Sequence, residues 1–186
     1  NILLLSHEDL KENKEGLFDK KSHIKFFNEL LFNNLPAEDY LDWGFTGRRA
    51  ITDTVQRELF SNNRNAIMLF GSGGIGKTSI ARYICEKQLT RKNVNFIWWH
   101  TSKTRTYSKN RIEAHAKNII NLKEVENLIL ETTGFTFHDL KEEEDYKPMF
   151  VLDNMENQKE DEVTRLVNKL SSVGKVIVTG RNALPN

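Results

Sequence analysis

The sequence predicts an α/β fold in which a parallel β-sheet is flanked by helices. Short apolar runs recur along the chain, and their continuous rather than alternating character is typical of strands that are covered on both faces. Helical patterns separate these runs, as expected for a parallel sheet. A glycine-rich loop, residues 71–76, joins one of the apolar runs to a helix and has the form of a phosphate-binding loop.

Residues 1–44 differ in character from the rest of the chain and are predicted to form a short helical extension or connector. Ser22 can cap a helix whose apolar residues follow helical spacing over 24–31, and Pro36 closes this segment. The apolar stripe can pack on the main domain, and the alternative is a hinge to an upstream domain. The chain begins with Asn1 rather than Met, which suggests a fragment of a longer polypeptide.

The main domain is predicted to span residues 45–186 and to alternate helices with strands. Thr52 or Asp53 can cap its first helix, a strand follows over 66–70, and the phosphate loop then leads into a helix over 78–89. The later predicted elements are strands over 95–99, 149–152 and 175–178 and helices around 122–129 and 163–170.

Local signals mark two of the later boundaries. Asn121 and Glu124 have the spacing of a capping box, which predicts that a helix begins there. Gly174 is predicted to end the helix that precedes the last strand.

The stretch from residue 71 to residue 78 matches G-x-x-x-x-G-K-[ST] and predicts a polyphosphate ligand. Its glycines let backbone N–H groups approach an anion where a Cβ would clash, and the helix that follows directs its positive end at the same ligand. Lys77 supplies a mobile cation for the β- and γ-phosphates, and the Thr78 hydroxyl is an expected Mg²⁺ ligand. The predicted contacts are Gly71, Ser72, Gly73, Gly74, Ile75, Gly76, Lys77, Thr78 and Ser79.

A second half of the site is predicted at the carboxyl ends of later strands. Asp153 follows four apolar residues, the pattern by which an Asp holds Mg²⁺ in phosphate-loop enzymes, and it would share the metal with Thr78. An Asp that opens an ordinary turn is the alternative. The last predicted strand ends in Thr179-Gly180-Arg181, which places a hydroxyl and a guanidinium at the same edge. The planar fork of Arg181 suits a γ-phosphate.

Composition narrows the classes of partner. Lys and Arg number 27 against 26 Asp and Glu, so no global field draws the chain to nucleic acid or to an anionic membrane. The single cysteine, Cys85, excludes an internal disulfide and a cysteine-cluster metal site. No apolar run is long enough to span a bilayer and no signal peptide is visible, so a cytoplasmic protein is expected.

Several segments occur together in the order found in NB-ARC proteins. They are residues 45–48, 71–78, 96–99 with 101–103, 151–156 and 176–181. The sequence resembles the nucleotide-binding domain of the STAND class of signal-transducing ATPases, which includes plant disease-resistance receptors and the apoptotic-protease-activating factor. The Trp98-Trp99 pair and the Asp-Asn-x-Glu ending look closer to bacterial members than to plant ones.

The resemblance implies a P-loop NTPase fold with ATP or ADP and Mg²⁺ as ligands. It implies that Thr46, Gly47 and Arg48 approach the adenine and that Arg181 senses the γ-phosphate. The resemblance also implies that this chain, which stops at Asn186, lacks the family's helical lid and winged-helix regions.

The resemblance also reveals a departure at the expected catalytic position. Many members carry a second acid after the metal-binding Asp, but Asn154 follows Asp153 here, and Glu156 is the fallback base. The catalytic candidates are therefore Asp153, Asn154 and Glu156. Hydrolysis is expected to be slow, because an amide can orient water but cannot take its proton at neutral pH.

Three functions are compatible with these residues. The first is a regulatory ATP/ADP switch that oligomerises with itself in the active full-length protein and acts through upstream or downstream sensor and effector domains. The second is a turnover ATPase or kinase, and the third is a nucleic-acid-associated ATPase, against which the near-zero net charge argues. What copurifies with the protein distinguishes them: ADP, an empty site or nucleic acid, respectively.

Overall fold

The computed structural model of this chain describes residues 32–36, 47–61, 64–102, 105–108, 111–114, 121–134, 136–142 and 146–183. The helices are α3 (Arg49–Ser61), α4 (Lys77–Thr90), α5 (Leu122–Thr133), α6 (Phe137–Glu142), the 3₁₀ turn η1 (Met155–Asn157) and α7 (Glu160–Ser171). The strands are β1 (Phe32–Asn33), β2 (Ala66–Phe70), β3 (Phe96–Thr101), β4 (Arg105–Ser108), β5 (Arg111–Ala114), β6 (Pro148–Asp153) and β7 (Lys175–Gly180).

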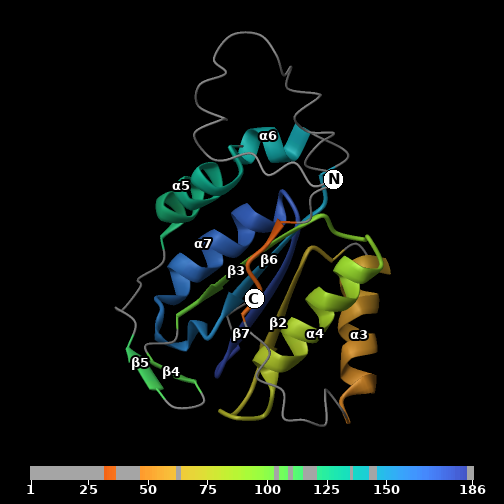
Figure 1. Cartoon of the computed structure of the whole chain (residues 1–186), viewed down its shortest axis with the longest axis vertical. Coiled ribbons are helices and arrows are strands. Elements are labelled where there is room, and N and C mark those ends of the chain that lie inside the picture. Colours follow the sequence, from red (N-terminus) through yellow and green to blue (C-terminus); the bar gives the residue numbers. More distant parts are fainter. Residues whose placement is uncertain are drawn as a thin grey trace. The chain divides into compact units, whose positions relative to one another are not determined.

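The main sheet has five strands in the order β1-β3-β6-β7-β2, and each adjacent pair is parallel (Figure 1). β4 and β5 form a separate antiparallel pair. Residues in β6 and β7 are buried almost throughout, as expected for strands covered on both faces. The predicted α/β class with a parallel sheet flanked by helices is confirmed.

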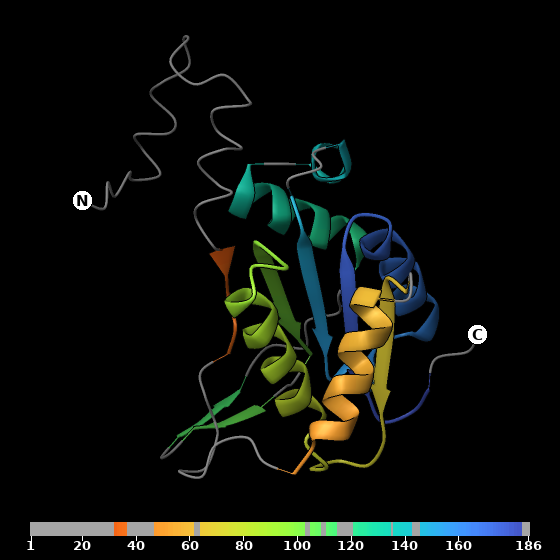
Figure 2. The same cartoon turned by 90° about the vertical axis from the view of Figure 1, so that its right-hand side faces the viewer.

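Two helical layers cover the sheet. α3 and α4 lie side by side on one face, and α5 and α7 lie on the other (Figures 1 and 2). The core under α3 and α4 includes Leu59, Ile84 and Trp99, all buried. The ring of Trp98 stacks on that of His100, and Trp98 is only 4% exposed. The two adjacent tryptophans therefore pack on opposite faces of β3.

Strand β1 was not predicted, and it lies within the range 1–44 for which the sequence predicts a helical connector. Phe32 and Asn33 instead pair in parallel with β3. The side chain of Asn34 continues this pairing: its Nδ2 donates to the carbonyl of Trp99 at 3.0 Å, and its Oδ1 accepts from the Trp99 amide at 2.6 Å. The predicted helix over 22–31 lies outside the described residues.

Most boundaries of the predicted elements agree with the structure, but α3 begins at Arg49, so neither Thr52 nor Asp53 caps it as predicted. The capping box is present: Oδ1 of Asn121 accepts from the backbone N–H of Glu124 at 2.9 Å, and Oε2 of Glu124 accepts from the backbone N–H of Asn121 at 3.4 Å. Strands β4 and β5, helix α6 and the turn η1 were not predicted. Within the described ranges, none of the helices combines the length and hydrophobicity that a bilayer-spanning segment requires.

Candidate nucleotide-binding site

The phosphate loop connects β2 to α4 through residues in unusual backbone conformations. Gly74 and Gly76 have φ angles of 77° and 91°, in the left-handed region where a side chain is strained. Gly71 has a φ of 143°, and a Cβ on it would lie 2.7 Å from Cδ1 of Ile75. Gly76 caps α4 without a side-chain hydrogen bond. A glycine loop at the N-terminus of a helix is an anion-binding arrangement.

Lys77 lies against the same loop. Its Nζ donates to the carbonyl oxygens of Gly71 at 2.7 Å and Ser72 at 2.9 Å. The side chain therefore folds back along the loop and places its positive charge next to the glycine backbone. This position is consistent with the predicted role of Lys77 as a cation for phosphate groups.

Asp153 is the centre of a cluster of hydroxyl groups. The carboxylate is 1% exposed at the end of β6, and its Oδ1 accepts from Oγ1 of Thr78 at 2.8 Å and of Thr179 at 2.7 Å. Its Oδ2 accepts from Oγ1 of Thr101 at 3.2 Å. The structure thus brings together Thr78 and Asp153, the two predicted metal ligands, although they are 75 residues apart in sequence.

The oxygen atoms of this cluster fit a magnesium ion chemically. Mg²⁺ prefers oxygen donors and is usually held by one or two carboxylates together with phosphate groups. Thr78 and Asp153 would hold the ion, which when bound would supply positive charge beside the phosphates.

Thr101 was missing from the predicted site, and the Thr179 hydroxyl was predicted at this edge of the sheet but not as a partner of Asp153. Both lie at the ends of parallel strands that neighbour β6, and the carboxyl ends of parallel strands meet at one edge of a sheet. The strand ends therefore contained a usable signal for both hydroxyls.

Asn154 and Glu156 follow Asp153 in a tight turn. Asn154 has a φ of 65°, a left-handed conformation that Asn tolerates better than most residues, and its backbone N–H donates to Oγ1 of Thr179 at 2.9 Å. Glu156 accepts from Nε of Arg181 at 3.1 Å through its Oε1. Nη2 of Arg181 lies 3.9 Å from the position of a Cβ on Gly73, so its guanidinium lies beside the phosphate loop.

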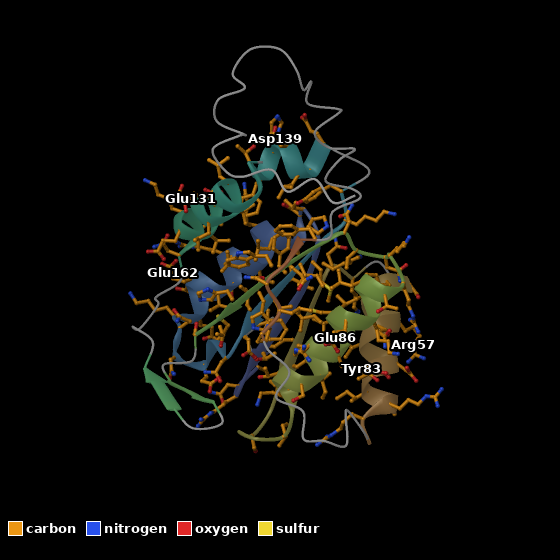
Figure 3. All side chains as sticks on the ribbon, in the orientation of Figure 1. Arg57, Tyr83, Glu86, Glu131, Asp139 and Glu162 are labelled. Carbon is orange, nitrogen blue, oxygen red and sulfur yellow. The ribbon has the colours of Figure 1, made fainter. Side chains whose placement is uncertain are left out.

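Arg48 also contacts the loop. Its guanidinium donates from Nη2 to the carbonyl of Ile75 at 3.0 Å. Next to this contact, a groove of about 360 Å³ between α3 and α4 is lined by Gly47, Arg48 and Tyr83 among others; Figure 3 labels Tyr83 on α4. Thr46, the remaining residue predicted near the base, lies outside the described residues.

His100 precedes Thr101 but lies on the opposite face of β3. It stacks on Trp98, with ring centroids 5.7 Å apart, and burial lowers the pKa of its imidazole. Adjacent strand residues point to opposite faces, so His100 does not share the face from which Thr101 reaches Asp153.

Comparison with known proteins identifies the family. A family model described as the NB-ARC domain matches residues 48–184. The chain belongs to the NB-ARC family. The resemblance inferred from the motifs is thereby confirmed, and the match includes the phosphate loop, Asp153 and Arg181.

Two further comparisons complete the description of this NB-ARC domain. No curated protein matches it. Among solved structures, it is similar to the crystal structure of domain III from the Thermotoga maritima replication initiation protein DnaA, with 15% sequence identity and a TM-score of 0.40. That match covers 75% of this chain and 53% of the DnaA chain, so the NB-ARC chain spans about half the length of the other. Its family and its phosphate loop together make the chain a P-loop nucleotide-binding ATPase module.

Proposed function

We propose that this NB-ARC domain is the ATP/ADP switch of a STAND signal-transducing ATPase, in which the bound nucleotide controls self-association. The observation that carries this proposal is the hydroxyl cluster on Asp153. One buried carboxylate links Thr78 of the phosphate loop to Thr101 and Thr179 on the neighbouring strands. A change at the phosphates can therefore bias several elements at once, as a nucleotide switch requires.

The ligand assignment follows the geometry of the loop. Residues 71–79 would hold the phosphates, with Lys77 as their cation, and Thr78 and Asp153 would hold Mg²⁺. The base is placed towards Gly47 and Arg48, and the contact of Arg48 with the loop and the adjoining groove support this placement.

Slow hydrolysis is part of this proposal. Asn154 stands where a second acid often follows the metal-binding Asp, and its side chain cannot act as a base at neutral pH. Oε1 of Glu156 is engaged by Arg181, which disfavours Glu156 as the base. Slow hydrolysis suits a switch, because it resets the triphosphate state without continuous turnover.

In the full-length protein, we propose that the active state is a homo-oligomer in the cytoplasm. Sensor and effector domains outside this chain supply input and output, and nucleic acid is not among the expected partners.

The nucleotide carried through purification tests the switch. The full-length protein should retain stoichiometric ADP, because a switch holds its resting ligand tightly, and chromatography of the supernatant after acid precipitation measures this. A Lys77→Ala preparation, made in parallel, should release none. An empty site with rapid steady-state turnover would point to an ATPase or kinase instead, and co-eluting nucleic acid would point to a nucleic-acid-associated ATPase.

The two arginines beside the loop should differ in their effects. Arg181→Ala should weaken ATP binding at least about tenfold and leave ADP binding nearly unchanged, because a hydrogen bond to a charged group contributes about 1.5–3 kcal/mol. Arg48→Ala should weaken both nucleotides alike, since it lies on the side of the base. Calorimetric titrations measure both effects, and equal losses for ATP and ADP in the Arg181 variant would rule out γ-phosphate sensing.

A further inference from the structure

Glu156 and Arg181 form an ion pair at the edge of the phosphate loop. Nε of Arg181 donates to Oε1 of Glu156 at 3.1 Å, and the side chains of Arg181 and Glu156 are 65% and 13% exposed, respectively. Nη2 of the same guanidinium lies 3.9 Å from the position that a Cβ would take on Gly73. Glu156 thus holds the inner nitrogen of Arg181, while a terminal nitrogen lies beside the loop.

The backbone that carries Glu156 is itself anchored. On one side of Glu156, the backbone N–H of Asn154 donates to Oγ1 of Thr179 at 2.9 Å. On the other side, the backbone N–H of Gln158 donates to the backbone carbonyl of Met155 at 3.0 Å, and Met155 is only 4% exposed. The carboxylate therefore projects from a fixed turn, whereas Arg181 is a long and largely exposed side chain.

A fixed carboxylate at Nε constrains the whole guanidinium. The group is planar and carries five N–H donors in a rigid fork, so a bond at Nε limits the rotation of the plane and leaves the terminal N–H groups available. An unconstrained arginine would have to lose this freedom when it binds a phosphate.

We propose that Glu156 is a positioning residue for Arg181, which it orients towards a third phosphate on the loop. The inference rests on the proposed function and adds a determinant of triphosphate over diphosphate binding. The opposite effect, competition between the Glu156 carboxylate and the third phosphate for Arg181, is disfavoured because the bond engages Nε and not the terminal nitrogens.

Calorimetry with ADP and with a non-hydrolysable ATP analogue, both with Mg²⁺, tests the proposal. Glu156→Ala should weaken binding of the analogue about fivefold, as expected for an ion pair with one exposed partner, and should leave ADP unchanged. Glu156→Gln should retain most of the affinity, because its side-chain oxygen can accept the same hydrogen bond. Tighter binding of the analogue, equal losses for both nucleotides, or a Gln variant as weak as Ala would each overturn the proposal.

A double-mutant cycle shows whether Glu156 acts through Arg181. In an Arg181→Ala background, Glu156→Ala should have no further effect on the analogue, and an additional loss of about fivefold would contradict the proposal. Glu160→Ala is the matched control, because it removes a carboxylate that lines the same small pocket as Glu156. If ADP and the ATP analogue bound equally well without Lys77, the proposed function itself would be refuted. Failure of the proposed function can therefore be distinguished from failure of the proposal for Glu156.

Discussion

Replacement of Lys77 by alanine is expected to abolish measurable nucleotide binding while the domain remains folded. The ammonium group lies along the phosphate loop, 2.7 Å and 2.9 Å from two loop carbonyls, where it can serve phosphate groups. Each charge-assisted hydrogen bond that Lys77 donates to a phosphate contributes about 1.5–3 kcal/mol to binding. The loss of two such bonds amounts to at least about a hundredfold in affinity. Calorimetric titration with ADP and ATP measures the change.

The fold should survive because the partners of Lys77 are backbone carbonyls on a loop that water can reach. A thermal unfolding scan of the ligand-free protein checks this point. Lys169→Ala is a suitable control: it removes the same type of side chain from α7, where Lys169 pairs weakly with Glu126 at 3.9 Å. If ADP and ATP bound the folded Lys77 variant as tightly as the unmodified protein, the phosphate-site assignment would be wrong.

The elements closest to the site were predictable because their signals are local. The glycine pattern from residue 71 to residue 78 needs a strand before it and a helix after it, and β2 and α4 are both present. The strand that ends at Asp153 was also predictable from a local signal. Its continuous apolar run indicates a strand covered on both faces, and β6 is buried along its whole length. In the capping box at Asn121, residues three apart bond each other within one turn.

What escaped prediction depends on contacts between distant parts of the chain. β1 has only two residues, and it exists because β3 offers an edge and Asn34 bonds Trp99, 65 residues away. Two residues are too few to show the alternation of a strand, and the helical spacing of the preceding apolar residues, 24–31, favoured a helix.

The structure offers a reason for the asparagine at position 154, where many family members have an acid, and the sequence alone does not reveal it. Compared with many family members, Asn154 replaces an acid, and this substitution predicts slow hydrolysis. In the structure it also adopts a left-handed conformation, with φ at 65°, as the N-cap of η1. Asn is one of the few residues that visits this region readily, so its presence serves the turn that carries Glu156. A backbone preference and a predicted catalytic change thus coincide at one position.

Asp153→Asn is expected to remove the effect of Mg²⁺ on ATP binding without unfolding the domain. In the unmodified protein, Mg²⁺ should tighten ATP binding, because an anionic oxygen next to the Thr78 hydroxyl suits this ion. Asparagine has nearly the same shape but no charge. The ratio of ATP dissociation constants in EDTA and in Mg²⁺ should therefore fall at least about tenfold, equivalent to about 1.4 kcal/mol.

The hydroxyl cluster explains why the Asp153→Asn substitution can be accommodated. An amide oxygen in place of Oδ1 can still accept from Thr78 and Thr179, and Thr101 can reverse its hydroxyl to accept from the amide nitrogen, because a hydroxyl both donates and accepts. The melting temperature should therefore change little, which separates loss of the metal from loss of the fold. Asp161→Asn, which alters an exposed acid in the first turn of α7, should leave the ratio unchanged. A full Mg²⁺ effect in the Asp153 variant would show that the ion is held by other residues, and Thr78 and Asp153 would then form only a structural hydrogen bond.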